Sequence, residues 1–87
     1  MQQQPIQVIA YVDAQGKLMP LRFRYEGADN RCHTAYVREV TARKEITFVG
    51  VEAQTFLCRV EEEGVERVYE LKYAFRPHRW TLLRQLS

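Results

Sequence analysis

Residues 21–25, with the sequence LRFRY, alternate large apolar side chains with arginine. A period of two residues is that of a β-strand, in which successive side chains point to opposite faces of a sheet. The same period returns in residues 56–60 and 69–73. These segments predict a sheet with an apolar inner face and a charged outer face. One shared core is expected to hold Phe23, Phe56, Tyr69, Leu71 and Trp80.

Turn-forming residues divide the rest of the chain into short strands. Residues 13–16 and 62–64 contain the glycine and acidic residues of tight turns, and the acidic tip at 62–64 is expected to be solvated. Residues 35–44 leave two alternatives, a bulged strand or a short helix, and their β-branched and aromatic residues favour the strand. The other expected strands are residues 5–12, 17–25, 46–51, 55–62, 65–73 and 79–86.

Six or seven short strands at near-regular spacing are typical of an all-β sandwich or a small barrel. In a chain of 87 residues we expect a strongly bent antiparallel barrel, because closure removes exposed sheet edges. The length suits one domain over residues 1–87, in which residues 1–4 are expected to be a flexible N-terminus.

The cellular compartment is predicted from cysteine usage and from the first residues. Cys32 and Cys58 are too few for a disulfide framework and are expected to be free thiols. The N-terminus lacks the basic and apolar regions of a signal peptide, and no segment approaches the ~20 apolar residues of a membrane span. The sequence therefore predicts a soluble, cytoplasmic protein.

Few residues offer chemistry for an enzyme. Cys32 and His33 could form a nucleophile pair, but adjacent strand residues point to opposite faces and an exposed loop does not tune their pKa values. Cys58 and His78 do not form a metal-binding motif with Cys32 and His33, because the four residues are not spaced as metal ligands are. The glycines form no phosphate-binding loop. We therefore expect a protein that is not an enzyme and has no catalytic residue, metal, cofactor or small-molecule substrate.

Basic residues interleaved with aromatic ones are the strongest functional pattern, although the net charge is only +2. If their strands are neighbours, these residues form a basic stripe for phosphates, with Tyr11 as a stacking group. In the alternative interpretation two of them pair with Glu61 and Glu70 on an ordinary solvated face. The candidate nucleic-acid-binding residues are Arg22, Arg24, Arg59 and Lys72.

A second candidate surface is apolar. Ile9, Tyr11 and Leu57 fall on the expected outer faces of their strands. A contiguous set of such residues would mark an interface with another protein or with a second copy of this chain.

Several short motifs give the chain a family resemblance. They are Pro5-Ile6-x-Val8, Asp13-x-x-Gly16, Phe23-Arg24-Tyr25, Tyr36-Val37-x-Glu39-Val40, Tyr69-Glu70-Leu71 and Arg79-Trp80-x-Leu82. In this order they resemble a family of small uncharacterised bacterial domains with SH3-like barrels, some of them associated with Y-family DNA polymerase components. The resemblance implies an SH3-like fold and a role as a DNA-repair accessory, and it carries no site residue to this chain.

Overall fold

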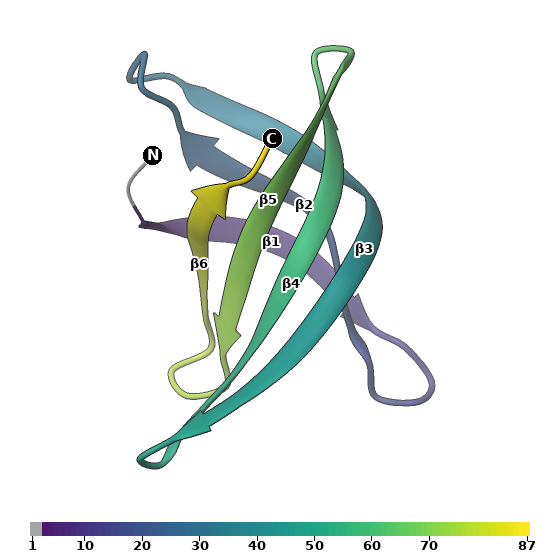
Figure 1. The fold of residues 1–87 in the computed structure, drawn as a ribbon, viewed down its shortest axis with the longest axis vertical. Helices are drawn as coiled ribbons and strands as arrows, with labels where there is room; N and C mark the ends of the chain where they lie inside the picture. The colour runs from purple at the N-terminus through teal and green to yellow at the C-terminus, as the bar shows by residue number, and fades with distance from the viewer. Residues whose placement is uncertain (1–2) are drawn as a thin grey trace.

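The computed structural model describes residues 3–87, apart from the side chain of Phe48, and consists of six strands joined by turns. The strands form a closed antiparallel barrel in chain order, in which the last strand pairs back onto the first (Figure 1). The all-β barrel expected from the sequence is therefore confirmed. The strands are β1 (Gln4–Val12), β2 (Leu18–Glu26), β3 (Cys32–Phe48), β4 (Val51–Glu62), β5 (Val65–Ala74) and β6 (Arg79–Gln85).

Residues 35–44 form a bulged strand and not a helix. They lie within β3, whose register against β4 shifts between Val37 and Glu39 and again between Val40 and Ala42. The separate strand expected at residues 46–51 does not form, because β3 runs on to Phe48 and the chain turns before β4 begins at Val51. The two predicted segments are one long bent strand, since each bulge increases the local twist without ending the pairing.

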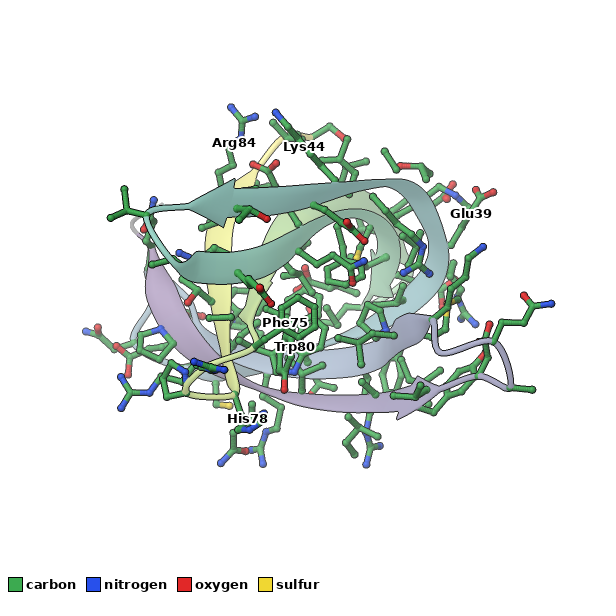
Figure 2. The ribbon with its side chains drawn as sticks, turned by 90° about the horizontal axis from the view of Figure 1, so that it is seen from below. Glu39, Lys44, Phe75, His78, Trp80 and Arg84 are labelled. Atoms are coloured by element: carbon green, nitrogen blue, oxygen red, sulfur yellow. The ribbon has the colours of Figure 1, made fainter. Side chains whose placement is uncertain are left out.

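The expected core is present in the barrel. Phe23, Phe56, Tyr69 and Leu71 are fully buried, and Trp80 is partly buried against Phe56, with ring centroids 5.4 Å apart. Seen from below, Trp80 lies within the ring of strands and Phe75 lies exposed at the lower opening, whereas Glu39, Lys44 and Arg84 point outward (Figure 2). Aromatic rings thus fill the lower end of the barrel.

Leu21 departs from the simple alternation that predicted its strand. Arg22 pairs with Ile9 and Pro20 pairs with Ala10, so that Leu21 is an extra residue at an irregularity in the β1–β2 register. A bulge of this kind leaves its additional side chain outside the alternating pattern. Leu21 is therefore exposed beside Arg22 on the outer face, and it is absent from the core.

The N-terminus differs in part from the expected flexible segment. Residues 1–2 lie outside the described part of the chain. Gln4, in contrast, is the first residue of β1, and its side-chain amide exchanges two hydrogen bonds with the backbone of Glu26, at 2.9 and 2.8 Å. Across residues 3–87 there is no helix of the length and apolarity that a membrane span requires.

Candidate functional site

The four candidate basic residues do not lie on neighbouring strands. Arg22 and Arg24 project from β2, Arg59 lies on β4 and Lys72 lies on β5. β3 separates β2 from β4, and β5 is further away around the barrel. The structure brings Arg22 and Arg24 together and leaves Arg59 and Lys72 on another side of the wall.

Arg59 is neutralised by two carboxylates. Its Nη1 lies 2.6 Å from Glu66 Oε1, and its Nε lies 3.4 Å from Glu39 Oε1. Its hydrogen bond to Glu66 raises the pKa of the guanidinium. The partners differ from those considered in the sequence, because Glu61 pairs with Arg38 and Glu70 with Arg84. The two ion pairs of Arg59 are exposed and add little stability. They nevertheless compensate its positive charge, so that Arg59 is a weaker site for a phosphate.

Arg22 and Arg24 belong to a different surface, the outward side of β1, β2 and β3. Here Arg22 lies between Ile9 and Tyr36, and Arg24 lies between Gln7 and Thr34. These six side chains, which we call the β1–β3 face, line a groove of about 480 Å³. Within residues 3–87 neither arginine forms an ion pair, and the groove is lined without any Asp or Glu.

Two of the three apolar candidate residues lie on the same outward side as Arg22 and Arg24. Ile9 and Tyr11 are 48% and 47% exposed, and Tyr36 and Leu21 next to Arg22 are 49% and 45% exposed. The predicted partner residue Leu57 is half-buried on β4, away from this face. Part of the predicted apolar surface and part of the predicted basic surface thus lie on one side of the barrel, because the β1–β2–β3 register aligns them.

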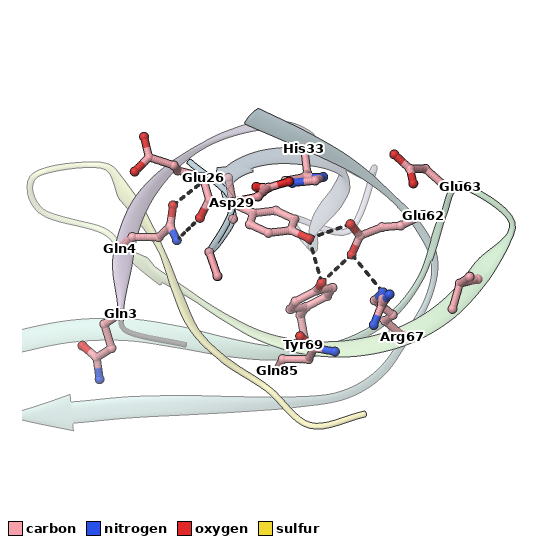
Figure 3. A pocket seen from close by; sticks show the side chains of 14 residues that line it. Gln3, Gln4, Glu26, Asp29, His33, Glu62, Glu63, Arg67, Tyr69 and Gln85 are labelled. Carbon is pink, nitrogen blue, oxygen red and sulfur yellow. Dashed lines mark hydrogen bonds and ion pairs between the residues drawn. The ribbon is translucent and has the colours of Figure 1, made fainter. Parts of the chain in front are cut away.

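A polar cluster that was missed in the sequence lies at the end of the barrel that is uppermost in Figure 1, near the β2–β3 and β4–β5 turns, and Figure 3 shows it from close by. Glu62 belongs to the tip that was expected to be solvated, yet its side chain is only 8% exposed. Tyr25 donates a hydrogen bond of 2.6 Å to Glu62 Oε2, and Tyr69 donates one to Oε1. Arg67 Nε lies 3.9 Å from the same Oε1. The residues of this cluster line a cavity of about 940 Å³, which we call the barrel mouth.

Both tyrosines of this cluster remain protonated hydrogen-bond donors. Burial, followed by the hydrogen bond to Glu62, raises the pKa of Tyr25 to about 12. The same two causes raise the pKa of Tyr69 above its ordinary value. A carboxylate that accepts two such bonds has the partners that its burial requires. The inward position of Glu62 could have been predicted from the sequence, because Glu62 lies two residues after the buried Val60 and alternate residues of a strand share a face.

His33 and Asp29 form an ion pair at the rim of the mouth. His33 Nε2 lies 3.0 Å from Asp29 Oδ1, and the imidazole stacks on Tyr25 with centroids 5.4 Å apart. Gly27 makes this contact fit, because a Cβ at that position would lie 2.8 Å from the imidazole. The hydrogen bond raises the pKa of His33 and lowers that of Asp29.

We expect Asp29→Asn to lower the pKa of His33 towards its ordinary value of 6.5, because the charged acceptor is lost while the side-chain shape is kept. Since the folded pKa of His33 is raised and that of Asp29 is lowered, the pair stabilises fully between their ordinary values of 3.8 and 6.5. Its contribution disappears as pH rises through the raised pKa of His33, and also as pH falls through the lowered pKa of Asp29. An NMR titration of the imidazole measures the change, with Glu45→Gln as the control. An unchanged His33 titration in Asp29→Asn would contradict this assignment.

The cysteines and the other histidine are dispersed over the barrel. Cys32 is exposed, and Cys58 is buried in the core, where burial raises the pKa of its thiol to about 12. His78 lies at the lower end, where its Nδ1 is 2.9 Å from the Tyr73 hydroxyl. In the described part of the chain no three His, Cys, Asp or Glu side chains gather as a metal site would require.

Comparisons with known proteins found no relative that gives information about either site. No protein-family model matches the chain. The searches of curated proteins and of solved structures also found no match.

Proposed function

We propose that this chain is a non-enzymatic binding module that holds nucleic acid on its β1–β3 face. The observation that carries the proposal is the pair Arg22 and Arg24, which lie side by side on β2 without an acidic partner. Side chains two residues apart on one face of a strand are spaced by about 7 Å. Guanidinium groups at this spacing suit successive phosphates, which they bind in bidentate fashion.

The surroundings of the two arginines support a phosphate ligand. Gln7 and Thr34 flank Arg24 and offer an amide and a hydroxyl for hydrogen bonds. Glu61, which pairs with Tyr36 across β3 and β4, is held by Arg38 at 2.8 Å. Glu26 follows Arg24 by two residues on the exposed side of β2, but it lies outside the groove. A polyanion on this surface therefore meets two free cations and no free carboxylate in the groove. Together with the family resemblance, this favours the role of a DNA-repair accessory, and the free thiols favour the cytoplasm.

The proposal is tested by fluorescence anisotropy with labelled DNA at about 50 mM and about 200 mM salt. We expect binding at low salt, and we expect Arg22→Gln/Arg24→Gln to reduce the slope of log K against log salt by about 2, because two phosphate contacts are lost. Arg76→Gln/Arg79→Gln, at the lower end, is the control. No binding at low salt, or equal slopes for the two variants, would refute nucleic-acid binding on this face.

Protein binding is the second candidate function. Ile9, Tyr11 and Leu21 favour it, since each is close to half exposed on the same side of the sheet. Tyrosine and arginine are enriched in protein interfaces, and exposed apolar residues that lie together mark such a surface. Self-association at this surface would give a mass that rises with concentration in sedimentation experiments. A strict monomer would leave a different protein as the only partner of this kind.

A further inference from the structure

The groove of the β1–β3 face places an exposed aromatic ring directly beside the first unpaired arginine. Tyr36 on β3 pairs with Arg22 on β2, and its side chain is exposed on the outer wall. On the other side of Arg22 lies Ile9, also exposed. Tyr36, Arg22 and Ile9 thus form a row across β3, β2 and β1, with an aromatic, a cationic and an apolar side chain in that order.

The next row carries hydrogen-bonding groups. Thr34, Arg24 and Gln7 lie across the same three strands, one step closer to the barrel mouth. Beyond them lie the exposed carboxylates of Glu26 and Glu63 at the mouth, whereas Glu62 is buried and Asp29 is paired with His33. Phosphates would be repelled there. The binding track is thus limited to the two rows of the β1–β3 face.

The side chains of the β1–β3 face can make different contacts with single-stranded and with double-stranded nucleic acid. In a duplex the bases are stacked on one another, so that an outer wall of this kind can contact phosphates but cannot stack on a base. In a single strand every base has a free face, and stacking on an aromatic side chain is a general mode of binding. Tyr36 therefore adds affinity for a single strand only.

We propose that the β1–β3 face selects single-stranded nucleic acid, with a base stacked on Tyr36 and the flanking phosphates on Arg22 and Arg24. This inference rests on the proposed function and extends it to a class of ligand. Thr34 and Gln7 are in position to hydrogen-bond the sugar or the base edge. Stacking does not depend on base identity, so binding has little sequence preference.

The experiment compares three labelled probes of about 16 nucleotides at low salt. They are a mixed-sequence DNA single strand, its duplex, and an abasic single strand that keeps the phosphates. We expect the single strand to bind roughly tenfold more tightly than either of the others, since only this probe offers a base to Tyr36.

Tyr36→Leu is expected to weaken single-strand binding roughly tenfold without changing the salt slope, because it removes stacking and keeps both arginines. Tyr36→Phe should retain the affinity, and Phe75→Leu, an exposed aromatic at the lower end, serves as the control for lost ring surface. Thermal unfolding of each variant confirms that it is folded.

The two proposals fail in different ways. If the duplex or the abasic strand binds as tightly as the single strand, or if Tyr36→Leu binds normally, selection for single strands is refuted while binding of phosphates stands. If none of the three probes binds at low salt, both proposals are refuted. Binding that is lost in Tyr36→Phe as well would also refute stacking, because phenylalanine keeps the aromatic face.

Discussion

Phe23→Ala is expected to lower the free energy of unfolding by about 3 to 5 kcal/mol. Phe23 is completely buried, and its ring packs edge-on against Tyr69 with centroids 5.5 Å apart. The substitution removes this apolar surface and leaves a cavity that the closed barrel cannot collapse to fill. A domain of this length has a total stability of roughly 4 to 13 kcal/mol, so the loss is a large part of it. Equilibrium unfolding in denaturant measures the change.

Two further variants make this prediction decisive. Phe23→Leu keeps most of the volume and should cost less than Phe23→Ala, which covers the case in which the alanine variant does not fold. Arg22→Ala changes the adjacent outward residue and should alter stability by no more than about 0.5 kcal/mol. Equal effects at positions 22 and 23 would contradict the inward placement of Phe23.

The second large effect is expected at the barrel mouth. Glu62→Leu should lower the free energy of unfolding by about 2 kcal/mol, because it removes the acceptor of both buried hydroxyls, those of Tyr25 and Tyr69. The two hydroxyls lie 3.0 Å apart, so one can donate to the other, but the second donor is left unpaired. Leucine keeps the site filled, so that water does not easily replace the carboxylate. Glu63→Gln at the neighbouring exposed position should be close to neutral.

A double-mutant cycle separates the hydrogen bonds of Glu62 from its other contacts. In a Tyr25→Phe/Tyr69→Phe background, Glu62→Leu should cost little or should stabilise, because no buried hydroxyl is left without an acceptor and Arg67 is exposed enough to be solvated by water. The same cost of Glu62→Leu in both backgrounds would show that the two tyrosines do not bind the carboxylate.

Much of the barrel is predictable from local alternation. Phe23 and Phe56 lie in runs where every second residue is apolar, and such runs determine which face is buried. Leu21 shows the limit of this reasoning, since it shares the pattern of Phe23 but is displaced by an irregularity opposite Ile9. A bulge depends on how two strands pair, and the sequence of one strand does not reveal it.

The candidate sites are less predictable because they depend on the register between distant strands. The sequence correctly puts Arg22 and Arg24 on one outward side, but the alignment of Arg22 with Tyr36 requires the β2–β3 register. At the mouth, the acidic run before Gly64 has the composition of an exposed turn. The alternation of β4 turns Glu62 inward, but its hydrogen-bond partner is known only once Tyr25, 37 residues away in the sequence, is placed beside it.

The short seam between β1 and β6 has a consequence for the order of folding. It consists of three residue pairs, Gln4 with Leu82, Pro5 with Thr81 and Ile6 with Trp80. Each of the other strand pairings joins neighbours in the chain and can form as soon as the second strand turns back. Closure must wait for the last strand to be synthesised, and until then the apolar inner surface stays open to water. The growing chain is therefore most exposed to aggregation just before β6 joins β1.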